Sequence, residues 1–587
     1  MKSKILIGIV ILVGIGTSFW FMRSGNIFGR LDILYQNPNA TIRHFAPTWR
    51  ALKKISDVYY LPTTFFHISK LPHYELTLSR KDFRALLDSL PTLTGGKPFL
   101  TEENRQTVLA EFHADGFAAT ARVRPRGLLP NHWSAGKKSW NINFVNNKFQ
   151  NRSALRLFIP EDRGWAAEFL EAYRARKFGV LTPDLKFVNL TINGKDYGVY
   201  TNIENWEPAF FENKGRAIGG IFAELDVEHP RDIFRLDAID SWQERIDPAL
   251  KNHRTAFAYF LYVISETSDK EFARRIPSIL NMDAYYGWAL EALLARNYHS
   301  KNEGNLNFYF DPSRGTFEPI AYDMFSWELG EQFEVAHNRL LNRIMAHEPF
   351  RKAFEQKAQE YINNPDNLAD DLAYYDSVAK SIEKDIAADT AKLPPTQEFF
   401  ATYKEHRRHI IANVEKIKLW FADGASLPIS FADEAYPLNA SNIREYDFST
   451  FDAISATDAE FVQMYPQFYP IQLGVIGIGP GKFRFTRDVI IPKGLNVIIR
   501  PNTELYLEPG ISVVSYSPIE ARGTATQPIG IKAASFWLPW GSFALVNTGK
   551  KSIFTHTDIA GGSSDVINGI VLEDALSLHN AEIEFQP

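Results

Sequence analysis

The densest group of cations that could hold a phosphate lies between residues 122 and 138. Five cations stand in these seventeen residues: Arg122, Arg124, Arg126, Lys137 and Lys138. A phosphate cradle needs cationic side chains and backbone N–H groups that a ligand can approach, and a glycine-containing loop separates the two cationic runs. The Walker A pattern G-x-x-x-x-G-K-S/T is absent from the loop. The alternative is a solvated hairpin whose charged side chains point outward.

A second polar group extends from residue 297 to residue 323. Its members are Asn297, His299, Lys301, Asn302, Asn305, Asn307 and Asp323. Metal-dependent phosphoryl transfer needs a carboxylate and an amide or carbonyl oxygen to hold the ion, and this group offers both. A polar loop with ordinary turn capping would have the same composition. A zinc site is disfavoured because His299 has no second ligand at helical spacing.

A third candidate is Glu204, which follows a strand-like segment ending at Ile203. A single glutamate at the end of a strand is usually a surface residue. Glu204 is a candidate functional residue only in combination with the two polar groups described above.

Alternating apolar residues predict the strands that must position these groups. The expected strands are 74–78, 117–123, 140–144, 187–192 and 197–200. Asn193-Gly194 is a strong signal for a tight hairpin between the last two. Helices are expected over 80–90 and 166–178, so the sequence predicts an α+β domain.

A helix is expected over 282–295, with Asn281 or Asp283 as its N-cap. Two short strands, 306–310 and 317–322, should follow as a hairpin. Residues 331–423 predict three or four amphipathic helices, which are broken at Pro365 and at Pro394-Pro395.

The composition changes after Gly424, where helix-forming residues become scarce. Apolar doublets recur between 488 and 531 at even spacing, and Gly or Pro-Asn separates them. Such short, regular strands predict stacked parallel rungs, as in a β-solenoid of the β-helix type. Four side chains should then point inward: Val497, Ile499, Leu505 and Leu507. A compact β-sandwich is the alternative.

Composition and charge limit the class of protein. The chain has 587 residues, a formal net charge of −5 and no cysteine. A nucleic-acid binder that depends on bulk positive charge is therefore excluded, as are disulfide scaffolds, thiol catalysis and thiolate metal sites. With 45% hydrophobic and 23% charged residues, the chain has the composition of a globular protein.

The segment Ile5–Met22 carries no charge and follows Lys2 and Lys4. Eighteen residues in a helix span about 27 Å, which is enough to cross a bilayer core. No Ala-x-Ala cleavage site lies nearby, so an uncleaved N-terminal transmembrane anchor is favoured over a cleaved signal peptide. The weak excess of positive charge before the segment predicts that the bulk of the protein is extracytoplasmic, in the cell envelope or at the surface.

The order of several motifs resembles the spore coat protein H (CotH) kinase-like family. They are R-x-R-G at 124–127, G-K-K-S-W at 136–140, I-P-E-D-R at 159–163, I-N-G at 192–194, G-V-Y at 198–200, I-E at 203–204 and P-I-A-Y-D at 319–323. The likeness covers about residues 70–425. It implies an atypical protein-kinase-like domain with a helical extension, bound ATP with Mg²⁺, and phosphoryl transfer to a protein.

The resemblance also implies roles for individual residues. Arg126 and Lys138 would address the phosphates, and Glu204 would lie near the adenine at the segment that joins the lobes. Asn305 and Asp323 would hold the metal. The family commonly has an Asp before the catalytic-loop Asn, whereas residues 296–301 contain no carboxylate. His299 is then the candidate base.

The resulting prediction divides the chain into four parts. These are a membrane anchor or signal segment (1–30), a spacer (31–70), the kinase-like domain with its helical extension (71–425) and a β-rich region (426–587). The partners would be a protein substrate, or an assembly partner at the cell surface, and the membrane. The alternative function is a non-catalytic assembly or adhesion module that uses the same folds for binding.

Overall fold

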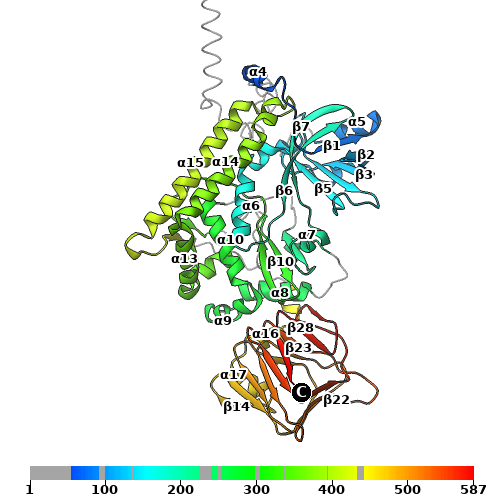
Figure 1. The fold of residues 1–587 in the computed structure, drawn as a ribbon, viewed down its shortest axis with the longest axis vertical. Helices are drawn as coiled ribbons and strands as arrows, with labels where there is room; N and C mark the ends of the chain where they lie inside the picture. Colours follow the sequence, from blue (N-terminus) through cyan, green and yellow to red (C-terminus); the bar gives the residue numbers. More distant parts are fainter. Residues whose placement is uncertain are drawn as a thin grey trace, which may run out of the picture.

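The computed structural model describes residues 54–91, 99–134, 136–224, 239–246, 253–297, 305–335, 338–392, 394–431 and 442–586. The apolar segment Ile5–Met22 and the candidate base His299 lie outside these ranges. Within them, no helix combines the length and the apolar character that crossing a bilayer requires. Figure 1 shows a strand-rich lobe at one end, a helical lobe in the middle and a β-solenoid at the other end.

The first lobe is a closed seven-stranded barrel in the order β1-β2-β3-β4-β5-β7-β6. Its strands are β1 (His73–Thr77), β2 (Val108–Ala114), β3 (Phe117–Pro125), β4 (Trp140–Phe144), β5 (Ala154–Phe158), β6 (Leu185–Ile192) and β7 (Lys195–Ile203). Every second residue points inward because side chains alternate along a strand; Leu76, Phe112 and Ile142 are fully buried. The Asn193-Gly194 hairpin joins β6 and β7, and both residues have positive φ. The predicted hairpin is confirmed.

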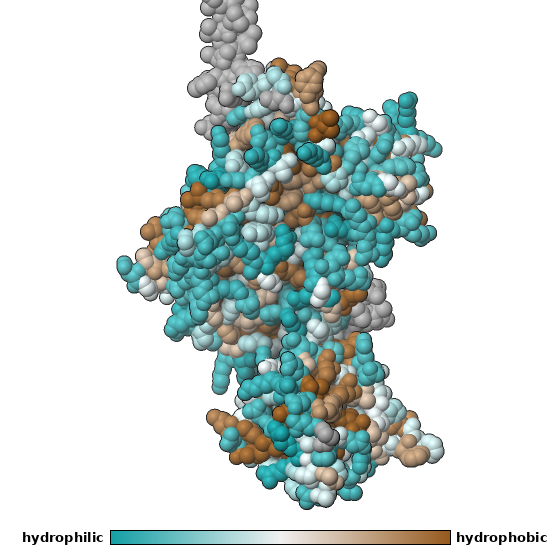
Figure 2. Space-filling model, in the orientation of Figure 1, coloured by the Kyte–Doolittle hydropathy of each residue, from teal (hydrophilic) through white to brown (hydrophobic). Residues whose placement is uncertain are grey.

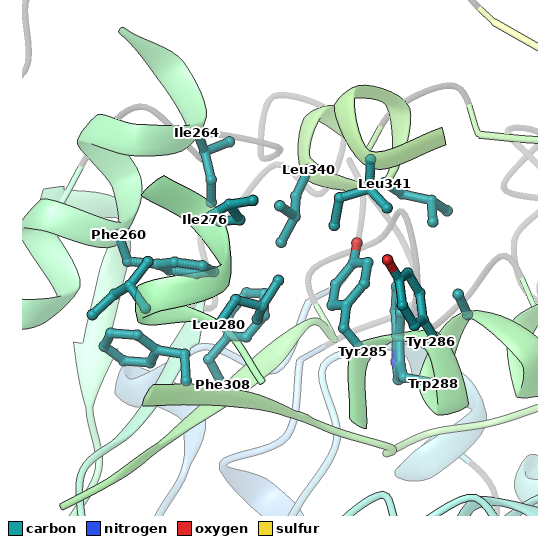
Figure 3. Packing of buried hydrophobic residues seen from close by; sticks show 14 of the residues in the cluster. Phe260, Ile264, Ile276, Leu280, Tyr285, Tyr286, Trp288, Phe308, Leu340 and Leu341 are labelled. Carbon is teal, nitrogen blue, oxygen red and sulfur yellow. The ribbon is translucent and has the colours of Figure 1, made fainter. Parts of the chain in front are cut away.

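The second lobe begins after β7 and is built around the sheet β11-β10-β8-β9. Its strands are β8 (Ile221–Glu224), β9 (Trp242–Glu244), β10 (Asn307–Asp311) and β11 (Thr316–Ile320). Helices α8 (His253–Ser265), α9 (Asp269–Ile279) and α10 (Met282–Ala295) share one buried core with these strands. Figure 3 shows Phe260, Tyr285, Trp288 and Phe308 in this core. The Asn281 side chain accepts the Ala284 N–H, which confirms it as the N-cap of α10.

Four further helices complete the helical extension: α12 (Arg339–Ala346), α13 (Glu348–Asn363), α14 (Pro365–Ala388) and α15 (Thr396–Trp420). Pro365 is the first residue of α14. Proline has no backbone N–H, and at this position the helix does not use one. The long pair α14 and α15 packs on α6 (Ala167–Lys177) and on the outside of the barrel, through a cluster that includes Phe169, Phe187 and Ile382. The barrel and the helices are therefore one packed unit.

The last part of the chain coils into rungs that form three sheets, parallel throughout except for the antiparallel pair of β14 and β15. Their orders are β14-β15-β18-β21-β24-β29, β16-β19-β22-β25 and β17-β20-β23-β28. The strands are β14 (Tyr469–Gln472), β15 (Val475–Ile478), β16 (Gly481–Phe485), β17 (Val489–Ile491), β18 (Asn496–Ile499), β19 (Thr503–Leu507), β20 (Val513–Ser515), β21 (Ile519–Arg522), β22 (Ile529–Ala533), β23 (Phe543–Val546), β24 (Ser552–Thr555), β25 (Thr557–Ala560), β28 (Leu576–His579) and β29 (Ile583–Gln586).

The parallel pairing confirms the predicted solenoid and rules out the β-sandwich. Val497, Ile499, Leu505 and Leu507 are buried in its interior cluster, as expected. Two short helices, α16 (Ser449–Ile454) and α17 (Asp458–Met464), precede the first rung. Ser430 still pairs with Glu334 of the helical lobe, so the solenoid itself begins later than residue 426.

The solenoid packs directly on the helical lobe. Mid-strand residues of its third sheet, Ile490, Val514 and Ala544, belong to the same buried cluster as the core of that lobe. An antiparallel hairpin, β26 (Asp565–Ile567) and β27 (Ile570–Leu572), extends this contact. At Gly569 an added Cβ would lie 2.9 Å from the Phe310 ring, so the two backbones approach closely there.

Candidate functional site

The β10–β11 hairpin brings the candidate metal residues to one end of the second lobe. Asn307 pairs with Ile320 in the antiparallel register. Asn305 precedes this pair and Asp323 follows it, so both lie beyond the same end of the hairpin. Asp323 has a positive φ of 55°, an uncommon conformation for a residue other than glycine. The hairpin thus places both residues beyond the same end of the sheet, and their joint hold on one metal ion stays a prediction.

The Asp323 carboxylate forms an ion pair with Arg163. Arg163 ends the short helix η4 (Pro160–Arg163), and its side chain is only 4% exposed, whereas that of Asp323 is 13% exposed. Glu168, in the first turn of α6, accepts the Asp323 N–H at 3.2 Å and lies 3.6 Å from the Arg163 guanidinium. The barrel side of the molecule therefore fixes both the backbone and the side chain of Asp323.

Cations and aromatic rings surround this ion pair at the junction of the lobes. The Arg126 and Arg163 guanidinium carbons lie 3.9 and 4.0 Å from the centre of the Phe158 ring. Arg126 directly follows β3, and its N–H bonds to the Ser139 carbonyl at 3.0 Å. On the other side Tyr322, from the segment after β11, lies 5.6 Å from the Arg163 guanidinium.

The charges of this cluster shift the acidity of Tyr322. Burial alone would raise the pKa of Tyr322, but the positive charges of Arg163, Arg126 and Arg156 outweigh this and leave the pKa below its usual value. Burial also lowers the pKa of Arg126 to about 9, with Tyr322 opposing the shift. Arg126 therefore still carries its charge at neutral pH.

The Arg126 guanidinium offers donors that fit a phosphate group. Its Nε and Nη1 atoms are buried and have no hydrogen-bond partner within the described ranges. A buried donor without a partner is costly, so such atoms commonly mark a place where a ligand or an ordered water binds. The donor set, three arginines beside a carboxylate, suits a phosphate that carries a divalent metal ion.

The structure also places Lys138. Its Nζ donates to the Trp133 carbonyl at 2.8 Å, and its side chain is largely buried just before β4. Burial lowers the pKa of Lys138 to about 8. The next residue, Ser139, accepts the Arg126 N–H with its carbonyl and the Ile159 N–H with its hydroxyl. Lys138 is therefore adjacent in sequence to a residue that contacts Arg126.

Glu204 lies where β7 leaves the barrel, at the segment that joins the lobes. Its carboxylate is buried, and it accepts hydrogen bonds from Lys214 Nζ at 2.5 Å and from the Asp184 N–H at 3.1 Å. Arg152 is 3.6 Å away. These contacts give Glu204 a structural role in closing the joint, and its place near an adenine stays a prediction.

Asn305 and Asp323 are the candidate metal ligands among the described residues. Within the described residues no three His, Asp or Glu side chains gather into a group that could hold an ion. Asp323, Asn305 and phosphate oxygens would then complete the coordination, a donor set that suits Mg²⁺, which is usually held by one or two carboxylates together with phosphates. His299 lies outside the described residues.

Sequence reasoning did not assign roles to Arg163, Glu168 or Tyr322. Arg163 and Tyr322 stand in the motifs I-P-E-D-R and P-I-A-Y-D, next to residues that were singled out. Their function becomes visible only from contacts across about 160 residues of chain, such as that between Arg163 and Asp323.

Glu161, two residues before Arg163, is expected to make stability depend on pH. Burial raises the pKa of Glu161 to about 7, although the charge of Lys137 opposes the shift. The folded protein then binds a proton that the unfolded chain releases near pH 4.5, so this contribution to stability is complete below pH 4.5 and is lost as the pH rises to 7.

Glu161→Gln should remove this dependence, because glutamine stays neutral. The unfolding free energy of the variant, relative to wild type, should rise by about 3 kcal/mol between pH 4.5 and pH 8. Denaturant unfolding at a series of pH values measures the difference. A constant difference across this range would show that Glu161 is ionised in the fold.

Comparisons with known proteins agree with the geometry. The family model described as "CotH kinase protein" matches residues 123–423, just over half of the chain. The inner spore coat protein H of Bacillus subtilis (strain 168) is 22% identical over 245 residues, which cover 39% of this chain and 67% of that protein.

Among solved structures, the Helicobacter pylori proinflammatory kinase CtkA matches with 10% identity and a TM-score of 0.20. The match covers 48% of this chain and 94% of that one. A TM-score of 0.20 supports no residue-by-residue correspondence between the two structures. The extent of the family match is the deciding finding, and it includes the barrel strands from Val123 onward, Arg163, Asp323 and the long helices. The chain belongs to the CotH kinase protein family.

Proposed function

We propose that this protein is an atypical kinase that transfers a phosphoryl group from ATP, with Mg²⁺, to a hydroxyl group of an extracytoplasmic protein. The observation that carries the proposal is the cluster of Arg126, Arg163 and Asp323 at the junction of the lobes. It combines unpartnered phosphate donors with a carboxylate fixed at the end of a hairpin. Membership of the CotH kinase protein family supports the same conclusion.

The residues would act in separate roles. Arg126 would donate to phosphate oxygens, and Asp323 with Asn305 would hold the metal ion. Bound Mg²⁺ would neutralise the charge that develops on the transferred group. The substrate hydroxyl oxygen forms a bond to the γ-phosphorus while the bond to the β–γ bridging oxygen breaks and ADP leaves. His299 would accept the hydroxyl proton.

Nucleotide binding by the full chain tests the proposal. Arg126→Met should weaken the affinity for ATP with Mg²⁺ by about 10- to 100-fold, because a charged hydrogen bond to phosphate is lost. Isothermal titration calorimetry measures the affinity. The matched control is Arg122→Met, which removes an exposed arginine from β3, the strand that Arg126 follows, and should leave binding unchanged. Equal affinity in both variants would refute the phosphate site.

His299→Ala separates transfer from binding. A base contributes about 10²- to 10⁴-fold to proton transfer, so transfer of labelled phosphate should fall by about this factor while ATP affinity stays unchanged. Single-turnover transfer and calorimetry on the same preparation provide the two readouts. Unchanged transfer would remove His299 from the mechanism.

A second function is a non-catalytic assembly or adhesion module. Two observations favour it: residues 296–301 contain no carboxylate, and Asp323 is already engaged by Arg163. The solenoid would then supply the binding surface. Tight binding of ATP with Mg²⁺ and no transfer to any protein of the cell envelope would support this function over the first.

A further inference from the structure

An exposed apolar surface lies at the end of the molecule opposite the solenoid. It is formed by Val58, Tyr59, Leu61, Phe65, Phe66 and Ile68, which are between 57% and 88% exposed. These residues belong to the short helices η1 (Lys54–Tyr60) and α4 (Leu61–Thr64) and to the turn after them. Figure 2 shows hydrophobic side chains at this upper end, and Figure 1 places α4 there. We call it the aromatic end surface.

The underside of this surface is attached firmly to the helical extension. Asp57 accepts hydrogen bonds from Lys392 Nζ at 2.8 Å and from the Thr396 N–H at 2.7 Å, at the start of α15. Tyr60 donates to Gln397 at 2.9 Å and stacks on Phe400 at 5.8 Å. The segment therefore directs polar side chains toward the protein and apolar side chains toward the outside. An ordinary surface segment has the opposite arrangement.

Charge distinguishes this region from the rest of the chain. Residues 43–70 contain five cations, Arg43, Arg50, Lys53, Lys54 and Lys70, and a single carboxylate, Asp57. The whole chain carries a net charge of −5. Exposed aromatic side chains flanked in the sequence by cations match the chemistry of a bilayer interface with anionic headgroups.

The sequence that precedes this surface also favours contact with a lipid bilayer. The apolar segment Ile5–Met22 is separated from Lys54 by residues 23–53, thirty-one residues that could span about 100 Å if extended. An anchor this many residues away in the sequence would not by itself fix the orientation of the lobes. A second contact would.

We infer that the aromatic end surface inserts into the interface of an anionic lipid bilayer and so holds the lobes against the membrane, with the solenoid directed away from it. The inference does not depend on phosphotransfer. It concerns where the protein sits and how it is oriented, and its test measures neither nucleotide binding nor turnover.

The absence of cysteine allows a direct test on the full chain. Phe66→Cys, labelled with an environment-sensitive fluorophore, is reconstituted in vesicles that contain phosphatidylglycerol and nitroxide-bearing lipids. We expect a blue shift and strong quenching. The matched control is Phe536→Cys in a solenoid loop, where the native side chain is 89% exposed against 88% for Phe66. That label should show neither effect.

Two outcomes would overturn the inference. Equal quenching at both sites, or none at Phe66, would show that the surface does not enter the bilayer. A shift at Phe66 that occurs without vesicles and grows with protein concentration would identify a second copy of the chain as the occupant.

A further variant separates insertion from mere proximity to an anchor. Phe65→Ser and Ile68→Ser, added to the labelled Phe66→Cys chain, should abolish the quenching because they remove the apolar contact. If quenching persists, the label is near the bilayer only because the chain is tethered there, and the inference fails. Vesicle flotation of the same samples reports separately whether the chain stays membrane-bound.

Discussion

Asp323→Asn is expected to abolish the metal dependence of nucleotide binding while the protein stays folded. Asparagine keeps an oxygen that can accept from Arg163, so the contact between the lobes survives, but the negative charge that attracts Mg²⁺ is gone. Turnover should fall by about 10²- to 10³-fold, the scale seen when a charge-stabilising contact is removed from an active site. Calorimetry with and without Mg²⁺ and circular dichroism provide the readouts.

The control for this experiment is Asp376→Asn in α14. Asp376 also accepts from an arginine, Arg407, at 3.2 Å, yet it lies outside the junction of the lobes. Its substitution should leave the effect of Mg²⁺ intact. If Asp323→Asn still binds ATP more tightly with Mg²⁺ than without it, Asp323 is not a metal ligand and its pair with Arg163 is purely structural.

Asp389→Ala is expected to destabilise the protein by about 3–5 kcal/mol, because it leaves the charge of Lys137 buried without its partner. The Lys137 Nζ and Asp389 Oδ2 atoms are 2.5 Å apart, and both side chains are fully buried. Asp389 also accepts the N–H groups of Val199, Ala391 and Lys392 at 2.8–3.0 Å. It thereby ties the end of α14 to β7 of the barrel. Denaturant unfolding followed by tryptophan fluorescence measures the loss.

A double variant tests the cause of this loss. Lys137→Met combined with Asp389→Ala leaves no buried charge, so it should be more stable than Asp389→Ala alone. If the double variant is no more stable, the lost backbone hydrogen bonds explain the effect and the charge of Lys137 does not. A loss below about 1 kcal/mol in Asp389→Ala would contradict the burial of the pair.

Local patterns were sufficient to predict most secondary structure and the solenoid. The helix 282–295 and its Asn281 cap agree with α10 because capping and apolar periodicity act over a few residues. The solenoid was predictable because each rung repeats the same inward-facing doublets, as at Val497 and Ile499. The position of Asp323 after a hairpin was also accessible, since a turn and two short strands are local features.

The composition of the site was less accessible. Arg163 and Glu168 reach Asp323 from about 160 and 155 residues away, and no local pattern records such a contact. The sequence likewise indicates nothing about Glu204 beyond its place after a strand, whereas the fold surrounds it with Lys214 and Arg152.

Lys137 and Lys138 separate what the sequence determines from what only the tertiary structure decides. They are adjacent in the loop before β4, and the sequence does not indicate what either side chain contacts. Only the fold decides that Lys137 meets Asp389, 252 residues later, and that Lys138 meets the Trp133 carbonyl. A lysine at this point of the sequence can form a buried ion pair or lie beside a phosphate site. Which of the two occurs depends on the distant segment of chain that packs against its side chain.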